Sequence, residues 1–338
     1  MKNIQFVFSL IIFLFTYLSC FSGVWQPTPQ KPYGGGDLQS FVIHNNDWYL
    51  TSNEEVSLFE TRAYIFHSTN AGESWERNVL NTNGSQLYVY DMKILDSAWI
   101  LSTSDKKILR TVDKGLSLYT CLIHLYGEIW DIVFSNNGIG ACTDSHNIYF
   151  CSDSVRTWQT ATHPARINLR VIKKINAVQC FGDSVIIMNC SVNNDSLTNY
   201  FGKSTNRGLD WTFKNCIDSV SGAMCFYDEM HGILGGAYHD KNYYYYSKYA
   251  ITSDGGNSWE TVFHQPGANS TTYCYYNSNG VIVFPSLRCF FLSKDNGKSF
   301  TKDTMMFEEK MYENIHDLQC TALGEFYAVG QKNLFKYF

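Results

Sequence analysis

One eight-residue phrase recurs six times along this chain, and it constrains the fold more than any other feature of the sequence. The clear copies have Ser or Thr first, Asp or Asn third, Gly fifth and an aromatic residue eighth. These copies begin at Ser68, Ser204, Thr252 and Ser293. Two weaker copies begin at Thr111 and Cys151, and the second has Val155 where the others have Gly. The chain is therefore built from repeats, and the repeat is the unit to interpret first.

The composition of the phrase predicts a tight turn. An Asp or Asn at the third position hydrogen-bonds backbone amides of its own turn. Gly at the fifth position supplies a positive φ, and the final aromatic ring packs into the next strand. We therefore interpret the third-position residues as structural rather than functional. They are Asn70, Asp113, Asp153, Asn206, Asp254 and Asp295.

This phrase resembles the Asp-box, S-x-D-x-G-x-x-W, also called the BNR repeat. Its copies begin 43, 40, 53, 48 and 41 residues apart, which is the length of a four-stranded propeller blade. The resemblance covers residues 24–338 and implies one all-β propeller domain. It implies little about activity, because such repeats occur in sialidases, xyloglucan-cleaving hydrolases, sortilin-type receptors and photosystem assembly factors.

The number of blades follows from the two ends of the chain. After the last phrase, strands are predicted at 316–320, 325–329 and 333–337, and a fourth is missing. The segment 24–28 resembles the strands that follow the other phrases, such as 158–162. We predict that this N-terminal segment supplies the missing outer strand, which gives seven blades of four antiparallel strands and closes the ring. The only helical turn expected lies near 305–312.

The first residues are typical of a signal peptide, which we place at 1–22. Lys2 precedes an apolar run from Phe6 to Leu18, and small residues follow. The run is about 13 residues long, short for a membrane span of roughly 20, and no later segment is longer. The mature chain is thus expected to be secreted, or to lie at the cell surface or in the periplasm. Residues 18–20 also loosely resemble a bacterial lipobox, so a lipid anchor at Cys20 is the alternative to plain cleavage.

Net charge and cysteine content limit the classes of partner, disulfide and metal site that this chain can have. The net charge of −5 leaves no basic excess for a nucleic acid. An even number of cysteines, ten, follows Cys20, so disulfides are plausible in an oxidising compartment, and Cys142 and Cys151 flank one short turn. Four others stand in the first strands of successive repeats and are expected as buried free thiols. They are Cys180, Cys225, Cys274 and Cys320. No zinc spacing is present, and we expect a monomer without a cofactor.

The sequence favours binding or scaffolding over catalysis. Sialidases carry a Phe/Tyr-Arg-Ile-Pro motif and three substrate-clamping arginines, whereas the nearest phrase in this chain, 164–168, lacks the proline and the chain has eight arginines in all. Xyloglucan hydrolases join two propellers around one cleft, and this chain has room for one. The alternative that stays open is a glycoside hydrolase, sialidase-like or xyloglucanase-like, that acts on extracellular glycans.

Insertions predict where a protein or glycan ligand would bind. Long connections are expected on the face opposite the repeated turns, at 51–61, 163–174, 191–200, 239–248 and 302–313. Tyr243 and Tyr245 lie in one of them and offer rings for a sugar or a protein partner. Arg166 and Arg170 lie in another. The alternatives are a tyrosine-rich blade edge and a solvated basic loop.

A second candidate site lies at the mouth of the central channel. Four carboxylates stand at the start of first strands in blades one, two, three and seven, beside three polar or aromatic side chains. The carboxylates are Asp37, Asp91, Asp131 and Asp317, and the neighbours are Tyr90, Trp130 and His316. An arc of this kind would hold a calcium ion or sugar hydroxyls. The alternative is that each Asp accepts backbone amides where the chain enters its strand.

Overall fold

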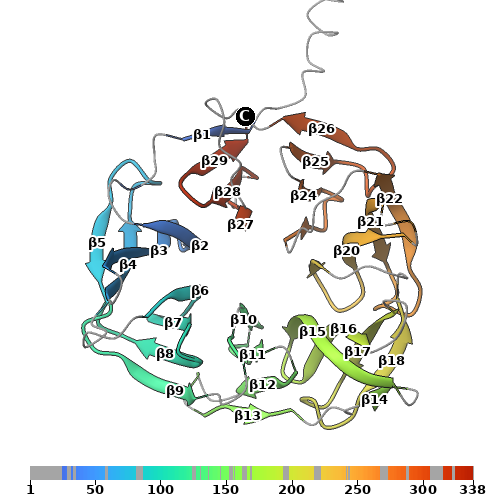
Figure 1. The fold of residues 1–338 in the computed structure, drawn as a ribbon, viewed down its shortest axis with the longest axis horizontal. Helices are drawn as coiled ribbons and strands as arrows, with labels where there is room; N and C mark the ends of the chain where they lie inside the picture. Colours follow the sequence, from blue (N-terminus) through green and yellow to red (C-terminus); the bar gives the residue numbers. More distant parts are fainter. Residues whose placement is uncertain are drawn as a thin grey trace, which may run out of the picture.

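The computed structural model describes residues 25–337 apart from 29–31, 33–35, 58–59, 81–86, 124–126, 130, 136, 145, 152–154, 156, 162–165, 168–169, 193–197, 217–221, 241, 243, 267–272, 287–288, 305–314 and 322–323. All regular structure in these residues is β-strand. The strands form seven antiparallel sheets that stand as blades around a central axis (Figure 1). The predicted all-β, seven-bladed propeller is thus confirmed. The expected helical turn at 305–312 lies outside the described residues.

The first three blades have four strands each, named in order from the axis outward. Blade 1 contains β2 (Asp37–His44), β3 (Asp47–Ser57), β4 (Glu60–Ser68) and β5 (Glu76–Val79). Blade 2 contains β6 (Val89–Leu95), β7 (Ala98–Thr103), β8 (Lys107–Thr111) and β9 (Tyr119–Ile123). Blade 3 contains β10 (Asp131–Phe134), β11 (Gly140–Thr143), β12 (Ile148–Cys151) and β13 (Gln159–Thr160).

The next three blades follow the same order, with one addition. Blade 4 contains β15 (Arg170–Phe181), β16 (Val185–Val192), β17 (Thr198–Ser204) and β18 (Thr212–Asn215), and β14 (Arg166–Ile167) adds a fifth strand beside β15. Blade 5 contains β19 (Met224–Phe226), β20 (Gly232–His239), β21 (Tyr245–Thr252) and β22 (Glu260–Pro266). Blade 6 contains β23 (Tyr275–Tyr276), β24 (Ile282–Ser286), β25 (Cys289–Ser293) and β26 (Thr301–Thr304).

Blade 7 closes the ring as predicted. Its strands β27 (Ile315–Cys320), β28 (Phe326–Gly330) and β29 (Leu334–Tyr337) come from the C-terminus, and β1 (Trp25–Pro27) comes from the N-terminus. Trp25 pairs with Tyr337, and Pro27 pairs with Phe335. Two chain segments about three hundred residues apart thus share one sheet, which covers the outer edge of β29.

Blades pack face to face, which explains why the middle strands are apolar throughout. All eight residues of β16 are buried, because neighbouring blades cover both faces of this sheet. Between blades 1 and 2, Ile65 and Tyr49 pack with Met92 and Leu101. Each fully buried large apolar side chain of this kind contributes roughly 1.5–3 kcal/mol. The core is therefore a ring of seams rather than one central cluster.

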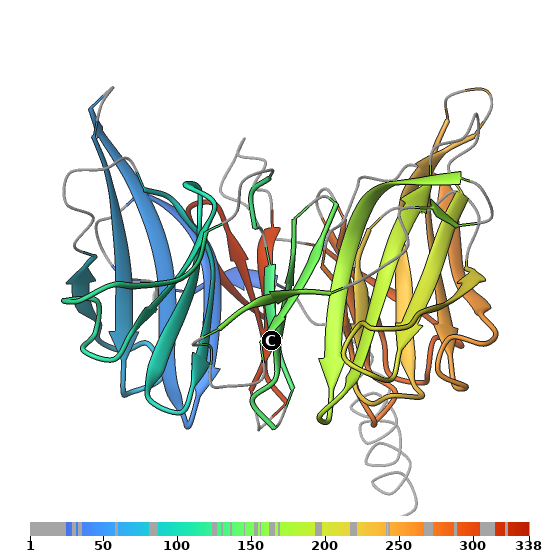
Figure 2. The same ribbon diagram turned by 90° about the horizontal axis from the view of Figure 1, so that it is seen from below.

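Most of the predicted long connections are extended hairpins. In blade 1, Glu54 pairs with Arg62 and Ser57 pairs with Glu60, so strands occupy most of 51–61. In blade 4, Ile167 pairs with Arg170, so the basic segment forms a hairpin as well. Figure 2 shows β3 and β4, in blue, rising above the ring on one side. The strands are long at these positions because backbone amides find partners more readily in a ladder than in a free loop. Among the described residues, no helix is long and apolar enough to cross a membrane.

Candidate functional site

The repeated phrases form turns with the same hydrogen bonds in all five described copies. The third-position oxygen accepts the hydroxyl of the first residue at 2.7–3.0 Å. It also accepts the amide of the seventh residue at 2.8–3.0 Å. The first-position hydroxyl accepts the amide of the fifth-position Gly at 2.8–3.0 Å. Asn70, Asp113, Asn206, Asp254 and Asp295 are thus occupied within their own turns, and Asp153 lies outside the described residues.

Glycine is required at the fifth position of the turn for two reasons, a positive φ and the close approach of the neighbouring blade. Its φ lies between 79° and 89° in the five copies. At Gly256 an added Cβ would also meet the Phe201 ring at 2.2 Å, so the close approach of blades excludes a side chain there. The fourth residue is left-handed too, with φ between 53° and 69°, which the sequence pattern did not indicate. Hydrogen bonds from Ser258 lower the pKa of Asp254 to about 2.

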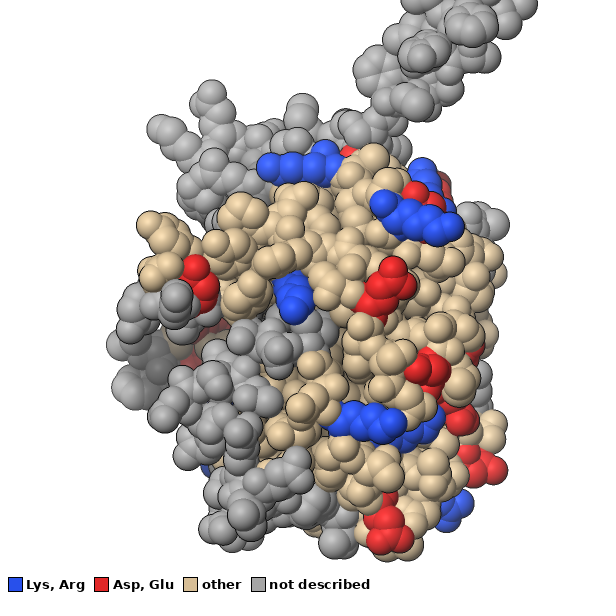
Figure 3. All heavy atoms as spheres, turned by 90° about the vertical axis from the view of Figure 1, so that its right-hand side faces the viewer, with Lys and Arg blue, Asp and Glu red and all other residues tan. Residues whose placement is uncertain are grey.

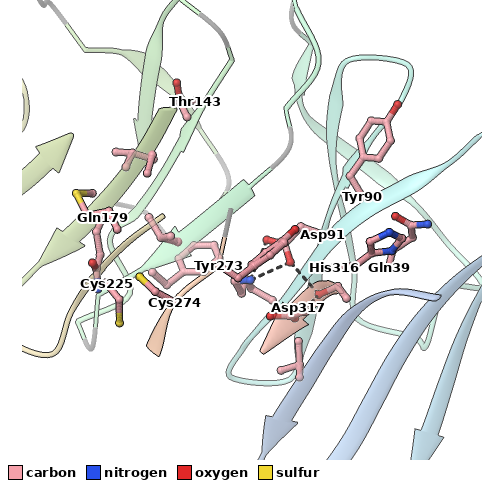
Figure 4. Close-up of a pocket in the computed structure, with 18 of the residues that line it drawn as sticks. Gln39, Tyr90, Asp91, Thr143, Gln179, Cys225, Tyr273, Cys274, His316 and Asp317 are labelled. Carbon is pink, nitrogen blue, oxygen red and sulfur yellow. Dashed lines mark hydrogen bonds and ion pairs between the residues drawn. The ribbon is translucent and has the colours of Figure 1, made fainter. Parts of the chain in front are cut away.

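The candidate ligand site is a central cavity of about 720 Å³ that runs along the axis of the ring. Innermost strands of several blades contribute its wall, as Figure 4 shows. Gln39, Tyr90 and His316 lie on one side of it, and Cys225 and Cys274 lie on the opposite side. The wall therefore has a polar side and a more apolar, sulfur-containing side.

Asp91 and Asp317 lie in this wall, and both hold the ring together. Asp91 accepts the amide of Ile132 in the next blade at 3.0 Å, and its other oxygen accepts the amide of Met92 at 2.8 Å. Asp317 does the same with Phe41 at 2.9 Å and Leu318 at 2.7 Å. Each carboxylate thus satisfies one amide of its own strand and one of the following blade, so it fastens two blades at the axis.

A shared hydroxyl joins the two carboxylates. The Ser40 hydroxyl lies 2.9 Å from Asp91 and 3.4 Å from Asp317. Lys93 donates to both oxygens of Asp91 at 2.8 Å. Burial raises the pKa of Asp317, and the Asp91 charge adds to this effect while the Lys93 ammonium opposes it. Among the described residues, Asp91 and Asp317 are therefore bound to backbone amides and linked through the Ser40 hydroxyl.

The predicted arc of four carboxylates forms only in part. Asp91 and Asp317 come together, whereas Asp37 lies apart and binds Gln331 at 2.6 Å and Lys332. Burial raises the pKa of Asp37 in part, but the hydrogen bonds from Lys332 and Gln331 bring it below its usual value. Ser40 takes the place in blade 1 that Asp91 takes in blade 2. The side chain of Asp131 and all of Trp130 lie outside the described residues.

Four innermost strands carry a β-bulge at the same level, and the bulged residues line the cavity. The register skips Gln39 and Ser40 in blade 1, Tyr90 in blade 2 and His316 in blade 7. In blade 4 it skips Asn176 and, earlier in the same strand, Lys173. Gln39, Tyr90, Asn176 and His316 line the cavity. A bulge turns a side chain away from its usual alternation. Tyr90 and His316 were predicted at this mouth from the sequence. Gln39 and Asn176 were not, because no pattern of apolar residues marks a bulge.

The protonation of His316 follows from its partner. The ring nitrogen Nδ1 lies 2.7 Å from the carbonyl oxygen of Leu38. A carbonyl only accepts hydrogen bonds, so Nδ1 carries a proton and Nε2 is the nitrogen left to face a ligand. For Tyr90, burial raises the pKa to about 12, and Glu128 adds to the shift. Tyr90 therefore keeps its hydroxyl proton at neutral pH and can donate and accept hydrogen bonds.

The other predicted surface residues lie away from the cavity wall. Tyr245 is 61 % exposed on the hairpin of β20 and β21. Tyr243 and the side chains of Arg166 and Arg170 lie outside the described residues. The sequence analysis missed a neighbouring cluster in which the rings of Tyr238, Tyr246 and His264 have centroids 5.5–6.0 Å apart. Figure 3, which faces the right-hand side of the ring, shows charges of both signs interspersed there.

Cysteine and metal chemistry is limited in the described part of the chain. None of the ten cysteines after Cys20, all of which the structure describes, forms a disulfide. The suggested pair is wrong, because Cys142 lies opposite Tyr149 and Cys151 lies opposite Gly140. Cys180 is buried, but Cys225, Cys274 and Cys320 are only half-buried. Across the described residues, no group of three or more His, Cys, Asp or Glu side chains is arranged to hold a metal ion.

Comparisons with known proteins establish the fold and nothing more specific. No protein-family model matches the sequence, and no curated protein matches it. Among solved structures, YCF48 bound to D1 peptide is similar with a TM-score of 0.63 and 14 % identity, over 94 % of this chain and 97 % of that one. The WD40 propeller domain of Doa1 has a TM-score of 0.63 and 13 % identity, over 94 % and 97 %.

A glycoside hydrolase is also among the similar structures. The GH74 xyloglucanase from Xanthomonas campestris has a TM-score of 0.57 and 12 % identity, over 91 % of this chain and 60 % of that one. At these identities the likeness concerns the propeller architecture, which serves many unrelated functions. Function has to be argued from the cavity and the surface.

Proposed function

We propose that this protein is an exported, non-catalytic binding or scaffolding propeller that takes a protein or glycan ligand at its central cavity and on the adjoining face. One observation carries the proposal. The buried cavity acids Asp91 and Asp317 are used to fasten the blades, while polar side chains on bulges line the cavity. The described part of the wall thus offers recognition groups, and its carboxylates are occupied by backbone amides.

Catalysis by this wall would need a carboxyl group within reach of a substrate. Both oxygens of Asp91 and of Asp317 accept backbone amides. Asp144, the other described acid of the wall, caps its own turn by accepting the amide of Asn147 at 2.8 Å. A substrate would therefore have to displace hydrogen bonds that hold the ring together.

Glycoside hydrolysis stays as the second candidate because of one specific feature. Asp91 and Asp317 share the Ser40 hydroxyl, and burial raises the pKa of Asp317. Two neighbouring carboxyl groups, one of them with a raised pKa, are the usual catalytic pair of a glycosidase. Release of reducing ends from neutral or sialylated oligosaccharides, abolished by Asp317→Asn in a folded variant, would establish this activity.

We also propose that residues 1–22 direct export and that the repeated turns make the chain a divergent Asp-box protein. The shared hydrogen bonds of five turns support the second point. For the first, β1 begins at Trp25, so a lipid on Cys20 would leave four residues between anchor and fold. The mass of the mature protein from its native host separates plain cleavage from lipidation.

The binding proposal is tested with the mature chain on a glycan array and in a pull-down from the medium around its host. Gln39→Trp places a bulky ring in the cavity mouth and is expected to abolish capture. Leu116→Ala, 75 % exposed in a repeated turn on the opposite face, is the matched control and is expected to bind normally. Capture of neither a glycan nor a protein, or capture that Gln39→Trp leaves unchanged, contradicts the proposal.

A further inference from the structure

The level of the bulges defines a ring of four side chains in the cavity, which we call the bulge ring: Gln39, Tyr90, Asn176 and His316. In blades 2 and 7 the bulge comes directly before the residue that fastens the blades, with Asp91 after Tyr90 and Asp317 after His316. The rigid fastening fixes the strand, and the bulge turns one side chain toward the axis. The ring is therefore a preorganised set of groups.

The bulge ring has unused hydrogen-bonding capacity of both kinds. The Nδ2 atom of Asn176 is buried and has no partner among the described residues. Nδ1 of His316 donates to the Leu38 carbonyl, so Nε2 is its second hydrogen-bonding atom and is an acceptor in the neutral ring. The Gln39 amide supplies both a donor and an acceptor. A ligand that matches these groups has to donate and accept at several neighbouring positions, as vicinal hydroxyls do.

Side chains occupy inner-edge backbone groups in blades 1, 2, 3 and 5, where a peptide strand would otherwise pair. A peptide that enters a propeller gains affinity by pairing its backbone with a free strand edge. In this cavity Asp91 occupies the Ile132 and Met92 amides, and Asp317 occupies the Phe41 amide. Gln179 occupies the Phe226 amide at 2.9 Å and its carbonyl at 2.7 Å. A peptide would thus lose its main source of binding energy at these positions. A ligand that hydrogen-bonds to side chains does not need these backbone amides and keeps its binding energy.

The described acids of the wall are each held by a cation or by backbone amides. Lys93 is paired with Asp91 at 2.8 Å, with the lysine side chain 28 % exposed. Asp317 is held by amides. An anionic ligand group placed beside the bulge ring would give up its hydration without meeting an unpaired cation among the described residues at that depth. A cationic group would have to compete with the amides that Asp317 accepts. Lys174 also lines the cavity and is exposed to solvent.

We infer that the bulge ring binds an uncharged oligosaccharide, with sugar hydroxyls on Gln39, Asn176 and His316 and a sugar face against the Tyr273 ring on the more apolar side of the wall. The negative face of an aromatic ring attracts the positively polarised C–H groups of a sugar. The volume of about 720 Å³ accommodates a few sugar units. This inference rests on the proposed binding function and narrows it to one ligand class.

Ligand-observed NMR with the mature protein tests it, using cellohexaose, xylohexaose, maltohexaose and mannohexaose one at a time. Sialyllactose is the anionic arm, and a random decapeptide library is the peptide arm. We expect saturation transfer to at least one neutral hexaose. Gln39→Ala, Asn176→Ala and His316→Ala should each weaken its affinity about tenfold, the effect of losing one buried hydrogen bond. Leu116→Ala should leave the affinity unchanged.

Three measurements distinguish a specific loss of sugar binding from a loss of folding. Each variant is first required to melt within a few degrees of the natural protein, and His316→Gln, which keeps an acceptor, should recover part of the affinity lost in His316→Ala. Binding of sialyllactose or peptide alone overturns the neutral-sugar inference and leaves the binding function standing. Absence of saturation transfer to all four hexaoses also overturns the neutral-sugar inference. Failure of the pull-down as well would remove the proposed function with it.

Discussion

The carboxylate of Asp317 accepts the backbone amide of Phe41 at 2.9 Å, across the seam where the last blade meets the first. The ring is thus closed twice, at its rim by the pairing of β1 with β29 and at its axis by this hydrogen bond. Two closures at opposite ends of one seam resist both sliding and opening of the blades. The same residue is therefore a poor choice for a general acid and a good one for a structural fastener.

Loss of the axial fastener should be costly. In Asp317→Ala, the Phe41 and Leu318 amides lose their buried acceptor, and we expect the free energy of unfolding to fall by about 2–4 kcal/mol. Asp37→Ala is the matched control, because its ion pair with Lys332 is partly exposed and should be worth less than about 1 kcal/mol. Urea unfolding of both variants measures the difference. Equal losses would show that the axial hydrogen bonds stabilise the ring no more than a surface ion pair does.

Loss of the rim closure should also be visible. Deletion of residues 24–30 removes β1 and exposes the edge of β29, whose Leu334 and Phe335 are fully buried. We expect a loss of several kcal/mol and a tendency to aggregate through the free edge. Differential scanning calorimetry and light scattering detect these effects. A deletion variant that melts with the natural protein would mean that the axial fastener alone closes the ring.

The repeated turns predict a specific acid sensitivity. The pKa of Asp254 is lowered to about 2 by hydrogen bonds from Ser258. A lowered folded-state pKa gives stability that is present above about pH 4 and is lost as the pH falls toward about 2. Asp254→Asn should remove this part of the pH dependence and keep the turn, because Asn70 and Asn206 occupy the same position naturally. Parallel plots of Tm against pH for the two proteins, between about pH 5 and 2, would contradict this assignment.

A buried acid at the seam between blades 6 and 7 predicts a stabilising substitution. Both oxygens of Asp303 in β26 are buried without a hydrogen-bond partner among the described residues. Burial raises the pKa of Asp303, and the nearby Tyr337 hydroxyl and Lys294 offset only part of this. A raised pKa gives stability that is present below about pH 4 and is lost as the pH rises through the folded-state pKa. Asp303→Asn should therefore raise Tm at about pH 8 but not at about pH 3.

Calcium should leave the melting temperature of the protein unchanged. Amides and Lys93 occupy the oxygens of Asp91 and Asp317, so a cation would have to compete with these hydrogen bonds and with one ammonium group. Binding to the folded state would raise Tm as the ligand concentration rises. We expect equal melts with calcium and with chelator. A calcium-dependent rise that Asp91→Asn abolishes would instead support a cation site at the mouth.

The sequence by itself determined the turns, the blades and their number. The phrase around Asp254 is complete within eight residues, because its hydrogen bonds join positions no more than four apart. Alternation of apolar residues then predicts strands between the turns, and the spacing of the turns predicts blades. Ring closure could also be predicted, since the segment at Trp25 resembles the strands that follow the repeated phrases. Local chemistry carries this information, so one sequence suffices for it.

The cavity was decided by the tertiary structure. Ser40 lies 277 positions from Asp317 along the chain, and no local pattern relates the two. The sequence placed Asp37 at the mouth, but a bulge at Gln39 brings Ser40 there instead and sends Asp37 to Lys332. Whether a carboxylate faces a ligand or a backbone amide depends on which strand the closed ring brings beside it. Burial and partners of this kind exist only after the blades have packed, so they are properties of the ring and not of any repeat.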